Sequence, residues 1–529
     1  MSSSGGIVDS RMPVPWLAAA LVLPLTVLVW FTVSWATSPL RRFPGPFLAG
    51  YTNLWRLIQV QSNDCHLSLK KLHDKYGPVV RIGPNLLDLD YPELIKTIYS
   101  TDGKWRKTEF YENNSAMVNG KQTFHMFSTT DEAEHSRMKR PVAKYFSLSH
   151  VLALEPHMDT VIRDLIKNLD ARFINPKKSC DLGDWVAFYA WDLISSATFS
   201  RRFGFMDAGH DFDQTITIAD KSMDYFSAVG QMPWLDYLLD KNPWMRIGPP
   251  NLSNITRISL ESLVARMQGK DANFDPKTPD YLQHFLDSKT AHPALIDDGT
   301  IMGYLLVNLL AGADTTAITI RAMFYFCLKS PRTDIYRRLV DEVRAAGFAV
   351  DEPAPYSAAR HLPYLEAVVR EAMRLHPAVS MPLERYVPAG GLALPGGAGF
   401  VPAGTAVGMN AFVTGRNKGG VWGEGGEKDV EEFRPERWLK REGPDGGETE
   451  TDEEYKVRLQ KMNAADLSFG GGARICTGRN LALVEVYKVV ATLVNRYDIE
   501  LEDPEREWDV TCRWFLRQKG LVTKISLRK

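Results

Sequence analysis

An uncharged apolar run lies near the start of the chain, from Val14 to Ala36. As a helix with a rise of about 1.5 Å per residue, it would be about 35 Å long, enough to cross a hydrocarbon core of about 30 Å. Trp16 and Trp35 lie near its ends, where aromatic side chains meet the membrane surface. The run exceeds the apolar region of a signal peptide and lacks the basic region before it, so it predicts a retained transmembrane anchor rather than a cleaved signal.

The charges around this run predict its orientation. Asp9 and Arg11 before it cancel, whereas Arg41 and Arg42 follow it directly, which places the rest of the chain in the cytosol. The next residues, Phe43–Pro46, contain two prolines that fix φ and remove backbone donors, which predicts a stiff, non-helical hinge. We therefore expect a short lumenal N-terminus (1–13), a transmembrane anchor (14–36), a hinge (37–50) and one globular catalytic domain (51–529).

Apolar positions in the globular part recur mostly with helical spacing. The spacing is clearest over residues 151–172, 298–329, 362–375 and 478–496. Two short apolar segments, Pro78–Ile82 and Leu86–Leu89, are typical of strands. Hydrophobic residues make up 44% of the chain and charged residues 24%, as in folded globular proteins, and no linker divides it. We expect one large domain, mainly α with a small β region (α+β).

Charge and cysteine usage narrow the range of partners and compartments. The 63 basic and 64 acidic residues nearly cancel, so no overall field predicts nucleic acid as a partner. The five cysteines form no Cys-x-x-Cys pair, and their odd number is typical of a reducing compartment rather than a disulfide scaffold. They are Cys65, Cys180, Cys327, Cys476 and Cys512.

Cys476 lies in a glycine-rich run from Phe469 to Gly478, just before an apolar helix that begins near Asn480. Glycines let the backbone bend tightly and approach a flat cofactor. A thiolate at a helix N-terminus is stabilised by the unpaired N–H groups and the helix dipole. An iron–thiolate ligand needs both properties. The alternative interpretation is a structural cysteine buried in a glycine-rich turn.

A polar segment interrupts the long apolar helix predicted over 298–329. Its residues 311–316 are Ala-Gly-Ala-Asp-Thr-Thr, and the small ones permit close approach of another group. Burying Asp314 beside Thr315 is costly unless both meet water or a partner, so this segment is expected to face a cavity. The alternative is a helix kink caused by threonine hydroxyls that bond to the backbone.

A third pattern combines Glu371 and Arg374, three residues apart on one helical face, with Arg437 about sixty residues later. Alone, Glu-x-x-Arg carries little information, because an exposed pair of this kind contributes about 0–1 kcal/mol. The pattern becomes informative about the fold because its three residues precede Cys476 in this order along the chain.

Together these motifs resemble those of the cytochrome P-450 family of haem-thiolate monooxygenases. The run 469–478 matches the family's haem-binding signature, Phe-x-x-Gly-x-Arg-x-Cys-x-Gly, at every defined position, and 311–316 is similar to its oxygen-activation motif. Glu371, Arg374 and Arg437 are similar to its buried Glu–Arg–Arg triad. Anchor and hinge are typical of microsomal members, and the hinge with Val401–Thr405 is most similar to the fungal branch that contains pisatin demethylase.

The resemblance implies a cytochrome P-450 fold that binds haem b, with Cys476 as the axial ligand of the iron. It implies that Arg474 pairs with a haem propionate and that Phe469 packs beside the sulfur. Asp314 and Thr315 would relay protons during oxygen activation. The triad of Glu371, Arg374 and Arg437 would lock the core of the haem pocket without taking part in the chemistry.

Three further positions follow from the same comparison. Arg385 lies where many microsomal members have a propionate-binding arginine. His135 and Lys139 lie on the helix whose Trp-x-x-x-Arg/His pattern contacts the propionates, but His replaces Trp here and Lys replaces Arg, which leaves open which cation makes the contact. The alternative is a solvated basic face.

The resemblance also implies the reaction and the partners. A separate NADPH-cytochrome P-450 reductase would deliver electrons, with cytochrome b5 as a second candidate donor, because no Gly-x-Gly-x-x-Gly unit for a dinucleotide is evident. One atom of O2 would enter a lipophilic small molecule by hydroxylation, epoxidation or oxidative demethylation, at the endoplasmic reticulum membrane and in fungal secondary metabolism. The alternatives are a detoxifying demethylase of plant defence compounds and a haem-based binding or sensing protein without turnover.

Two apolar segments are candidates for contact with the substrate, residues 106–127 and Val379–Leu383. They favour a terpenoid, polyketide or aromatic natural product. Ordinary core packing is the alternative for each residue. The bulky apolar side chains of the first segment are Phe110, Tyr111, Met117, Phe124 and Phe127.

Overall fold

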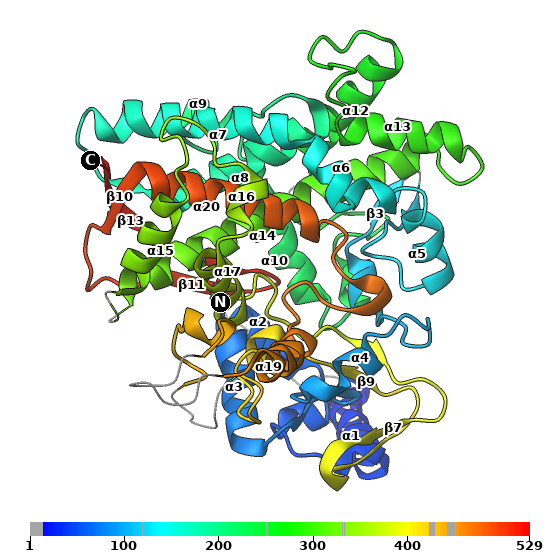
Figure 1. Ribbon diagram of the computed structural model, residues 1–529. Coiled ribbons are helices and arrows are strands. Elements are labelled where there is room, and N and C mark those ends of the chain that lie inside the picture. Colours follow the sequence, from blue (N-terminus) through cyan, green and yellow to red (C-terminus); the bar gives the residue numbers. More distant parts are fainter. Residues whose placement is uncertain are drawn as a thin grey trace, which may run out of the picture.

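The computed structural model describes residues 14–118, 120–249, 252–330, 332, 334–422, 429–441 and 450–528. Helices make up most of this part of the chain, and small sheets lie at its edges (Figure 1). The predicted fold class, mainly α with a small β region, is confirmed. The segment expected as a lumenal N-terminus, 1–13, lies outside the described residues.

The α-helices follow the apolar periodicity of the sequence. They are α1 (Val14–Thr37), α2 (Leu54–Gln61), α3 (Cys65–Tyr76), α4 (Ile95–Ile98), α5 (Glu132–Lys139), α6 (Leu148–Ala153), α7 (Glu155–Leu169), α8 (Leu182–Phe199), α9 (Phe205–Ala208), α10 (Thr215–Val229), α11 (Trp234–Leu238), α12 (Ser253–Met267), α13 (Tyr281–Ala291), α14 (Asp298–Lys329), α15 (Asp334–Ala345), α16 (Tyr356–Ala359), α17 (Pro363–Leu375), α18 (Ala411–Thr414), α19 (Asp452–Ala465) and α20 (Arg479–Arg496).

Three of the four predicted helical segments correspond to single helices, α14, α17 and α20. The fourth, 151–172, is divided: α6 ends at Ala153 and α7 begins at Glu155. Pro156 lies in the first turn of α7, where its missing N–H costs nothing, whereas a proline within a continuous helix would break a backbone hydrogen bond. The position of this proline explains the break.

The strands form several small sheets. The largest is ordered β1 (Val79–Gly83), β2 (Leu86–Leu89), β9 (Ala406–Gly408), β6 (Arg385–Tyr386), and it contains both predicted strands. β2 and β9 pair in parallel, and the other two pairs in this sheet are antiparallel. The remaining sheets are β10 (Tyr497–Leu501) with β13 (Val522–Leu527) and β5 (Cys180–Asp181), β11 (Asp509–Cys512) with β12 (Leu516–Lys519), β3 (Ala116–Val118) with β4 (Lys121–Thr123), and β7 (Leu392–Leu394) with β8 (Gly399–Val401).

α14 is the central helix of the body. It packs against α8 along much of its length and also against α17 and α20. Among the side chains that the structure describes, it is the one helix long and apolar enough to span a membrane, but half of its most apolar stretch is buried inside the body. α14 is therefore a core helix, and its apolar character serves packing.

The expected hinge packs onto the body. It forms two 3-10 turns, η1 (Pro39–Arg42) and η2 (Leu48–Gly50), and the Leu40 side chain within η1 is only 1% exposed. Arg81 holds the segment: its backbone N–H donates to the Pro44 carbonyl at 2.7 Å, and its guanidinium donates to Ser38 and to the Gly50 carbonyl. A Cβ at Gly45 would lie 2.1 Å from the Arg81 carbonyl oxygen, so this position requires glycine. The last turn of α1 is thereby fixed relative to the body.

Candidate active site

Cys476 lies between a 3-10 turn, η10 (Gly472–Arg474), and the N-terminus of α20. Its backbone N–H donates to the Phe469 carbonyl at 2.9 Å, which folds the loop back on itself. Gly470 and Gly472 both have positive φ, 68° and 61°. A Cβ at Gly472 would lie 2.1 Å from the Tyr99 carbonyl oxygen, so both the backbone conformation and the close approach require glycine.

The environment of Cys476 differs from that of the other cysteines. Cys476 is exposed, whereas the other four are buried. The loop around the thiol removes part of its hydration and so raises its pKa, although solvent reaches the side chain, whereas the backbone N–H groups of Gly478 and Arg479 and the positive charge of Lys139 act in the opposite direction. Burial raises the pKa of Cys65 to about 12 without a comparable set of donors. Cys476 is the thiol placed to act as a thiolate ligand.

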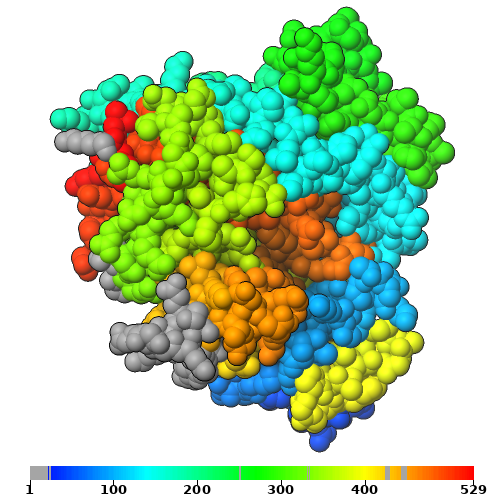
Figure 2. All heavy atoms as spheres, in the orientation of Figure 1, coloured from blue at the N-terminus to red at the C-terminus, as the bar shows by residue number. Residues whose placement is uncertain are grey.

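In Figure 2 the orange segments, which include α19, lie at the surface between the blue N-terminal part and the yellow-green helices. The Phe469 ring is half-buried and packs against the main hydrophobic core.

The polar segment of α14 does not break the helix. α14 continues from Asp298 to Lys329, although the Thr315 hydroxyl donates to the Ala311 carbonyl at 2.8 Å. Ala311 is exposed and Thr315 half-buried, whereas the residues on the other side of this turn are buried. The hydrogen bond of the alternative interpretation is thus present, the helix continues through it, and the segment presents one partly accessible face.

Asp314 occupies the buried side of the same turn and is 8% exposed. Its Oδ1 accepts a hydrogen bond from Trp191 Nε1 on α8 at 3.1 Å, and its Oδ2 has no partner. Burial, reinforced by the charge of Asp220, raises the pKa of Asp314 to about 7, against the opposing effect of Arg517. A carboxyl group with this pKa can both donate and accept a proton near neutral pH. Sequence reasoning missed Trp191, because nothing in the sequence places α8 beside this turn.

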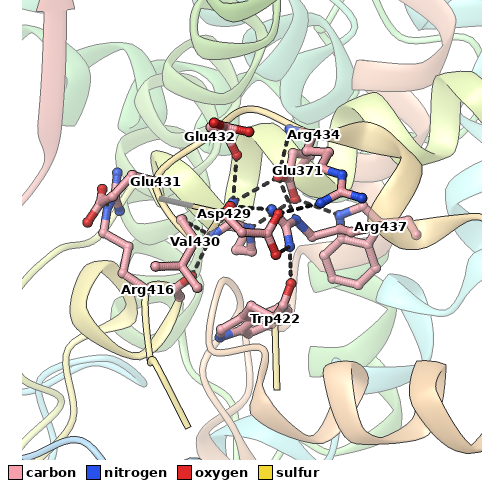
Figure 3. A network of polar contacts seen from close by, with 12 residues as sticks. Glu371, Arg416, Trp422, Asp429, Val430, Glu431, Glu432, Arg434 and Arg437 are labelled. Atoms are coloured by element: carbon pink, nitrogen blue, oxygen red, sulfur yellow. Dashed lines mark hydrogen bonds and ion pairs between the residues drawn. The ribbon is translucent and has the colours of Figure 1, made fainter. Parts of the chain in front are cut away.

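Glu371, Arg374 and Arg437 come together in a buried ionic network (Figure 3). Glu371 is fully buried; Arg374 contacts its carboxylate at 2.8 and 2.9 Å, and Arg437 at 2.8 Å. Trp438 Nε1 and the Arg434 backbone N–H complete the set of donors, each at 2.9 Å. Burial alone would raise the pKa of Glu371, but the two guanidinium groups outweigh it and lower the pKa to about 2.

The two arginines also bind backbone carbonyls of the chain around them. Arg374 donates to the carbonyls of Gly415, Val430 and Glu432, and Arg437 to those of Trp422 and Asp429. Figure 3 shows Trp422, Asp429, Val430 and Glu432 grouped around Glu371 and Arg437, which belong to α17 and to the 3-10 turn η8 (Pro435–Trp438). The network therefore fixes the irregular segments that precede the Cys476 loop.

A second cluster of cations contains the positions expected to bind an anionic group. Arg474 is mostly buried and pairs with Glu132 on α5 at 2.9 Å. His135, one turn further along α5, is 7% exposed. Burial and the charges of Arg474, Lys139, Lys107 and Arg385 lower its pKa to about 3. His135 is thus surrounded by cations and is itself neutral at physiological pH.

Lys139 points to a different place from His135. Its Nζ donates to the Ala473 carbonyl at 2.8 Å, within the Cys476 loop. Its charge is close enough to Cys476 to affect the pKa of both groups. Of the two predicted cations of α5, His135 therefore faces the cation cluster and Lys139 supports the cysteine loop.

Lys107 is a member of the cation cluster that sequence reasoning missed. It is 5% exposed, and its Nζ donates to the Phe127 carbonyl at 2.7 Å and lies 4.0 Å from the centre of the Tyr111 ring. Burial, followed by the charges of Arg474 and Arg385, lowers its pKa well below the ordinary value. A backbone bridge between Lys107 and Arg385 brings them together. No local sequence signal separates Lys107 from its solvated neighbours.

An aromatic cluster adjoins Lys107. Phe110, Tyr111 and Phe127, which the sequence suggested, pack against Phe226 of α10 and Trp514, with ring centroids 4.9–6.3 Å apart. Two other suggested side chains behave differently. Met117 is 46% exposed on β3, and Phe124 is not part of these ring contacts. Phe226 and Trp514 were missed because they come from distant parts of the chain.

The cationic side chains and the thiol of this region fit haem, which carries two carboxylates and an iron atom. Arg474 and Arg385 lie close enough to Lys107 to lower its pKa, and Glu132 pairs with Arg474. Such an excess of buried positive charge is costly without a bound anion. The exposed thiol of Cys476 at a helix N-terminus supplies an iron ligand. Among the described residues no cluster of histidine, cysteine and carboxylate side chains suggests a different metal site.

Comparison with known proteins agrees with this geometry. The family model for cytochrome P-450 matches residues 44–526. The chain is 45% identical to the cytochrome P-450 monooxygenase cfoH of Aspergillus candidus, over 97% of this chain and 93% of that protein. It is 38% identical to a cytochrome P-450 monooxygenase of Aspergillus terreus, over 89% of this chain and 92% of that protein. It is 34% identical to the cytochrome P-450 monooxygenase cicH of Emericella nidulans, over 92% of this chain and 94% of that protein. The chain belongs to the cytochrome P-450 family and is a monooxygenase.

Proposed function

We propose that this protein uses Cys476 as the thiolate ligand of haem b and inserts one atom of O2 into a lipophilic aromatic small molecule. The observation that carries this proposal is the placement of Cys476: the exposed cysteine among five, in a loop shaped by glycines, at the N-terminus of α20. Haem bound there would supply the iron at which O2 is activated, and the electron-rich thiolate favours cleavage of the O–O bond.

The cation cluster is proposed to hold the haem carboxylates. Arg474, Arg385 and Lys107 are the charged members, and His135 can donate one hydrogen bond from its neutral ring. Lys139 has another role, because its hydrogen bond to Ala473 holds the cysteine loop and its charge stabilises the thiolate. Glu371, Arg374 and Arg437 fix the segment before this loop and take no part in the reaction.

Asp314 and Thr315 are proposed to handle protons during oxygen activation. With its pKa raised to about 7, Asp314 can take a proton from the buried side of α14 and release it near neutral pH. Thr315 lies on the partly accessible side of the same turn, so its hydroxyl can pass a proton or hold a water molecule there. A binding or sensing protein without turnover has no need of such a pair.

Electrons would come from NADPH through a separate reductase, with cytochrome b5 as a second candidate donor. The aromatic cluster of Phe110, Tyr111, Phe127, Phe226 and Trp514 supports an aromatic, lipophilic substrate, since flat rings pack well against such a surface. The similar monooxygenases come from filamentous fungi. We therefore place the reaction in fungal secondary metabolism rather than in the detoxification of plant compounds.

Two apolar surfaces support attachment to the endoplasmic reticulum membrane. The first is α1, where Val22, Leu25, Leu28 and Trp30 are each at least 60% exposed. The second surrounds α11, which follows α10 in the chain and contacts it. Its exposed apolar side chains are Trp234, Tyr237, Leu238, Trp244, Met245 and Ile247. Large exposed apolar patches are expected where a protein meets lipid.

The proposal is tested by the spectrum and the reaction of the full-length protein in microsomes. The reduced protein with CO should show the red-shifted Soret band of a thiolate ligand, and Cys476→Ala should abolish it, whereas Cys512→Ala should retain it because Cys512 is buried elsewhere. Product formation should require NADPH and reductase. Retention of the band in Cys476→Ala would refute the ligand assignment, and a normal band without product from any lipophilic aromatic compound would favour the binding protein.

A further inference from the structure

A buried carboxylate lies next to the basic side chains proposed to hold haem. Glu384 directly precedes Arg385 in the chain and is 4% exposed. One of its carboxylate oxygens accepts a hydrogen bond from the buried Arg56 of α2, and the other accepts one from the Thr108 hydroxyl at 2.7 Å. Thr108 directly follows Lys107. Glu384 is therefore bound at both oxygens, between the two segments that carry Arg385 and Lys107.

Backbone contacts hold these two segments side by side. Lys107 and Arg385 form an antiparallel bridge, and the Tyr386 N–H donates to the Arg106 carbonyl at 2.8 Å. The guanidinium of Arg385 folds back and donates to the Glu384 carbonyl at 2.8 Å. It thus lies beside the residue whose carboxylate is held by another arginine.

Arg385 and Lys107 are buried basic side chains without a carboxylate partner. Among the described residues neither forms an ion pair, and their side chains donate to backbone carbonyls at 2.8 and 2.7 Å. A buried charge without a counter-ion is costly, so this arrangement favours a bound anion. The Glu384 carboxylate beside them could supply the negative charge, but Arg56 already binds it. Two basic side chains without a carboxylate match the two carboxylates of haem.

We propose that Arg56 is a positioning residue that holds the Glu384 carboxylate away from Arg385 and Lys107, so that both remain available to the carboxylates of haem. The inference rests on the haem site proposed above. Without Arg56, the buried carboxylate of Glu384 would lose its counter-ion and turn to the adjoining basic side chains, because an unpaired buried charge is strongly disfavoured. It would then compete with haem for them. Arg56 therefore acts through Glu384.

The alternative is a purely structural ion pair between α2 and the start of β6. A structural pair is broken by the removal of either partner, so loss of Arg56 and loss of the Glu384 charge would loosen haem alike. A positioning role predicts different effects. Loss of Arg56 frees a competing carboxylate, whereas loss of the Glu384 charge removes the competitor.

Haem transfer from the full-length ferric protein to apomyoglobin measures this difference without turnover. Arg56→Met should release haem on the order of tenfold faster than wild type, as expected for a lost hydrogen bond to a charged group. Glu384→Gln should release haem no faster than wild type. The double variant Arg56→Met/Glu384→Gln should return to nearly the wild-type rate, because it contains no free buried carboxylate. Arg106→Met, which removes a 48% exposed guanidinium from the adjoining segment, should keep the wild-type rate.

Resonance Raman spectra of the same proteins supply a readout that a loss of stability does not move. The bands of the haem carboxylate side chains should shift in Arg56→Met and return to the wild-type position in the double variant. Arg266→Met is the control for the loss of a buried pair. Arg266 of α12 pairs with the buried Asp280 at 2.7 Å, so this change should lower the free energy of unfolding without a shift of these bands.

Faster haem release from both single variants, without rescue in the double variant, would overturn the inference and leave a structural pair. A wild-type release rate in Arg56→Met would refute it as well. If Arg56→Met lost its haem before the measurement, the double variant should still retain haem, and a double variant without haem would count against the positioning role. Failure of the proposed function gives a different result: wild type would form no NADPH-dependent product, while the order of haem release among the variants would remain.

Discussion

Removal of the Glu371 carboxylate should be among the most destabilising single changes in the body. Each factor of ten in acidity corresponds to about 1.4 kcal/mol, so lowering the pKa from an ordinary value of about 4.3 amounts to about 3 kcal/mol. The lowered pKa of Glu371 is about 2. Glu371→Gln would take the buried carboxylate away from Arg374 and leave Arg437 with Asp429 at 3.5 Å, and breaking such a buried pair costs about 3–5 kcal/mol. We expect a loss of 3–5 kcal/mol in the free energy of unfolding.

The measurement is urea unfolding of the detergent-solubilised protein, followed together with its haem content. Glu261→Gln is the matched control: Glu261 pairs with Arg257 at 2.9 Å, but both side chains are more than half exposed, so this change should cost less than about 1 kcal/mol. The folded-state pKa of Glu371 is lowered, so its stabilisation is present above the unfolded-state pKa and is lost as the pH falls from about 4 toward 2. Equal losses for the two variants would refute the reasoning.

Four further outcomes are expected. Thr315→Ala should keep the haem spectrum and substrate affinity but divert electrons to peroxide, and unchanged product per NADPH would count against the relay. Product formation should fall as the pH rises above about 7, where Asp314 loses its proton, and Asp314→Asn should remove this dependence and alter the solvent isotope effect. Lys107→Met should release haem to an acceptor protein several-fold faster than wild type, whereas Lys104→Met, at a side chain that is 70% exposed, should not. Protease added to intact microsomes should digest the body beyond residue 37, and full protection would place it in the lumen.

The order of motifs along the chain was sufficient to predict the family, the fold class and the position of Cys476. The family model and the similar monooxygenases confirm the first two. Such predictions succeed because a glycine-bracketed cysteine before a helix, and a helix with a regular apolar pattern, are encoded within short segments. Even the division of 151–172 into two helices has a local cause, the proline at 156.

The cation cluster required the tertiary structure. Lys107 has no sequence feature that separates it from Lys104 or Arg106, and it joins Arg474 only because its strand-like segment pairs with Arg385. The different directions of His135 and Lys139 likewise depend on where the cysteine loop lies beside α5. Position in sequence gives spacing along one helix, but it does not say which distant segment each face contacts.

The polar groups of the core show the same limit most clearly. Sequence alone identified Asp314 and Thr315 as an unusual pair within an apolar helix, because a carboxylate there contrasts with its neighbours. It gave no signal for Trp191 of α8, which donates a hydrogen bond to Asp314. Burial raises the pKa of Asp314, and this burial arises only when α8 and α14 pack together. The sequence identified the residues that match the motifs of the family, and the packing decided their charge and their partners.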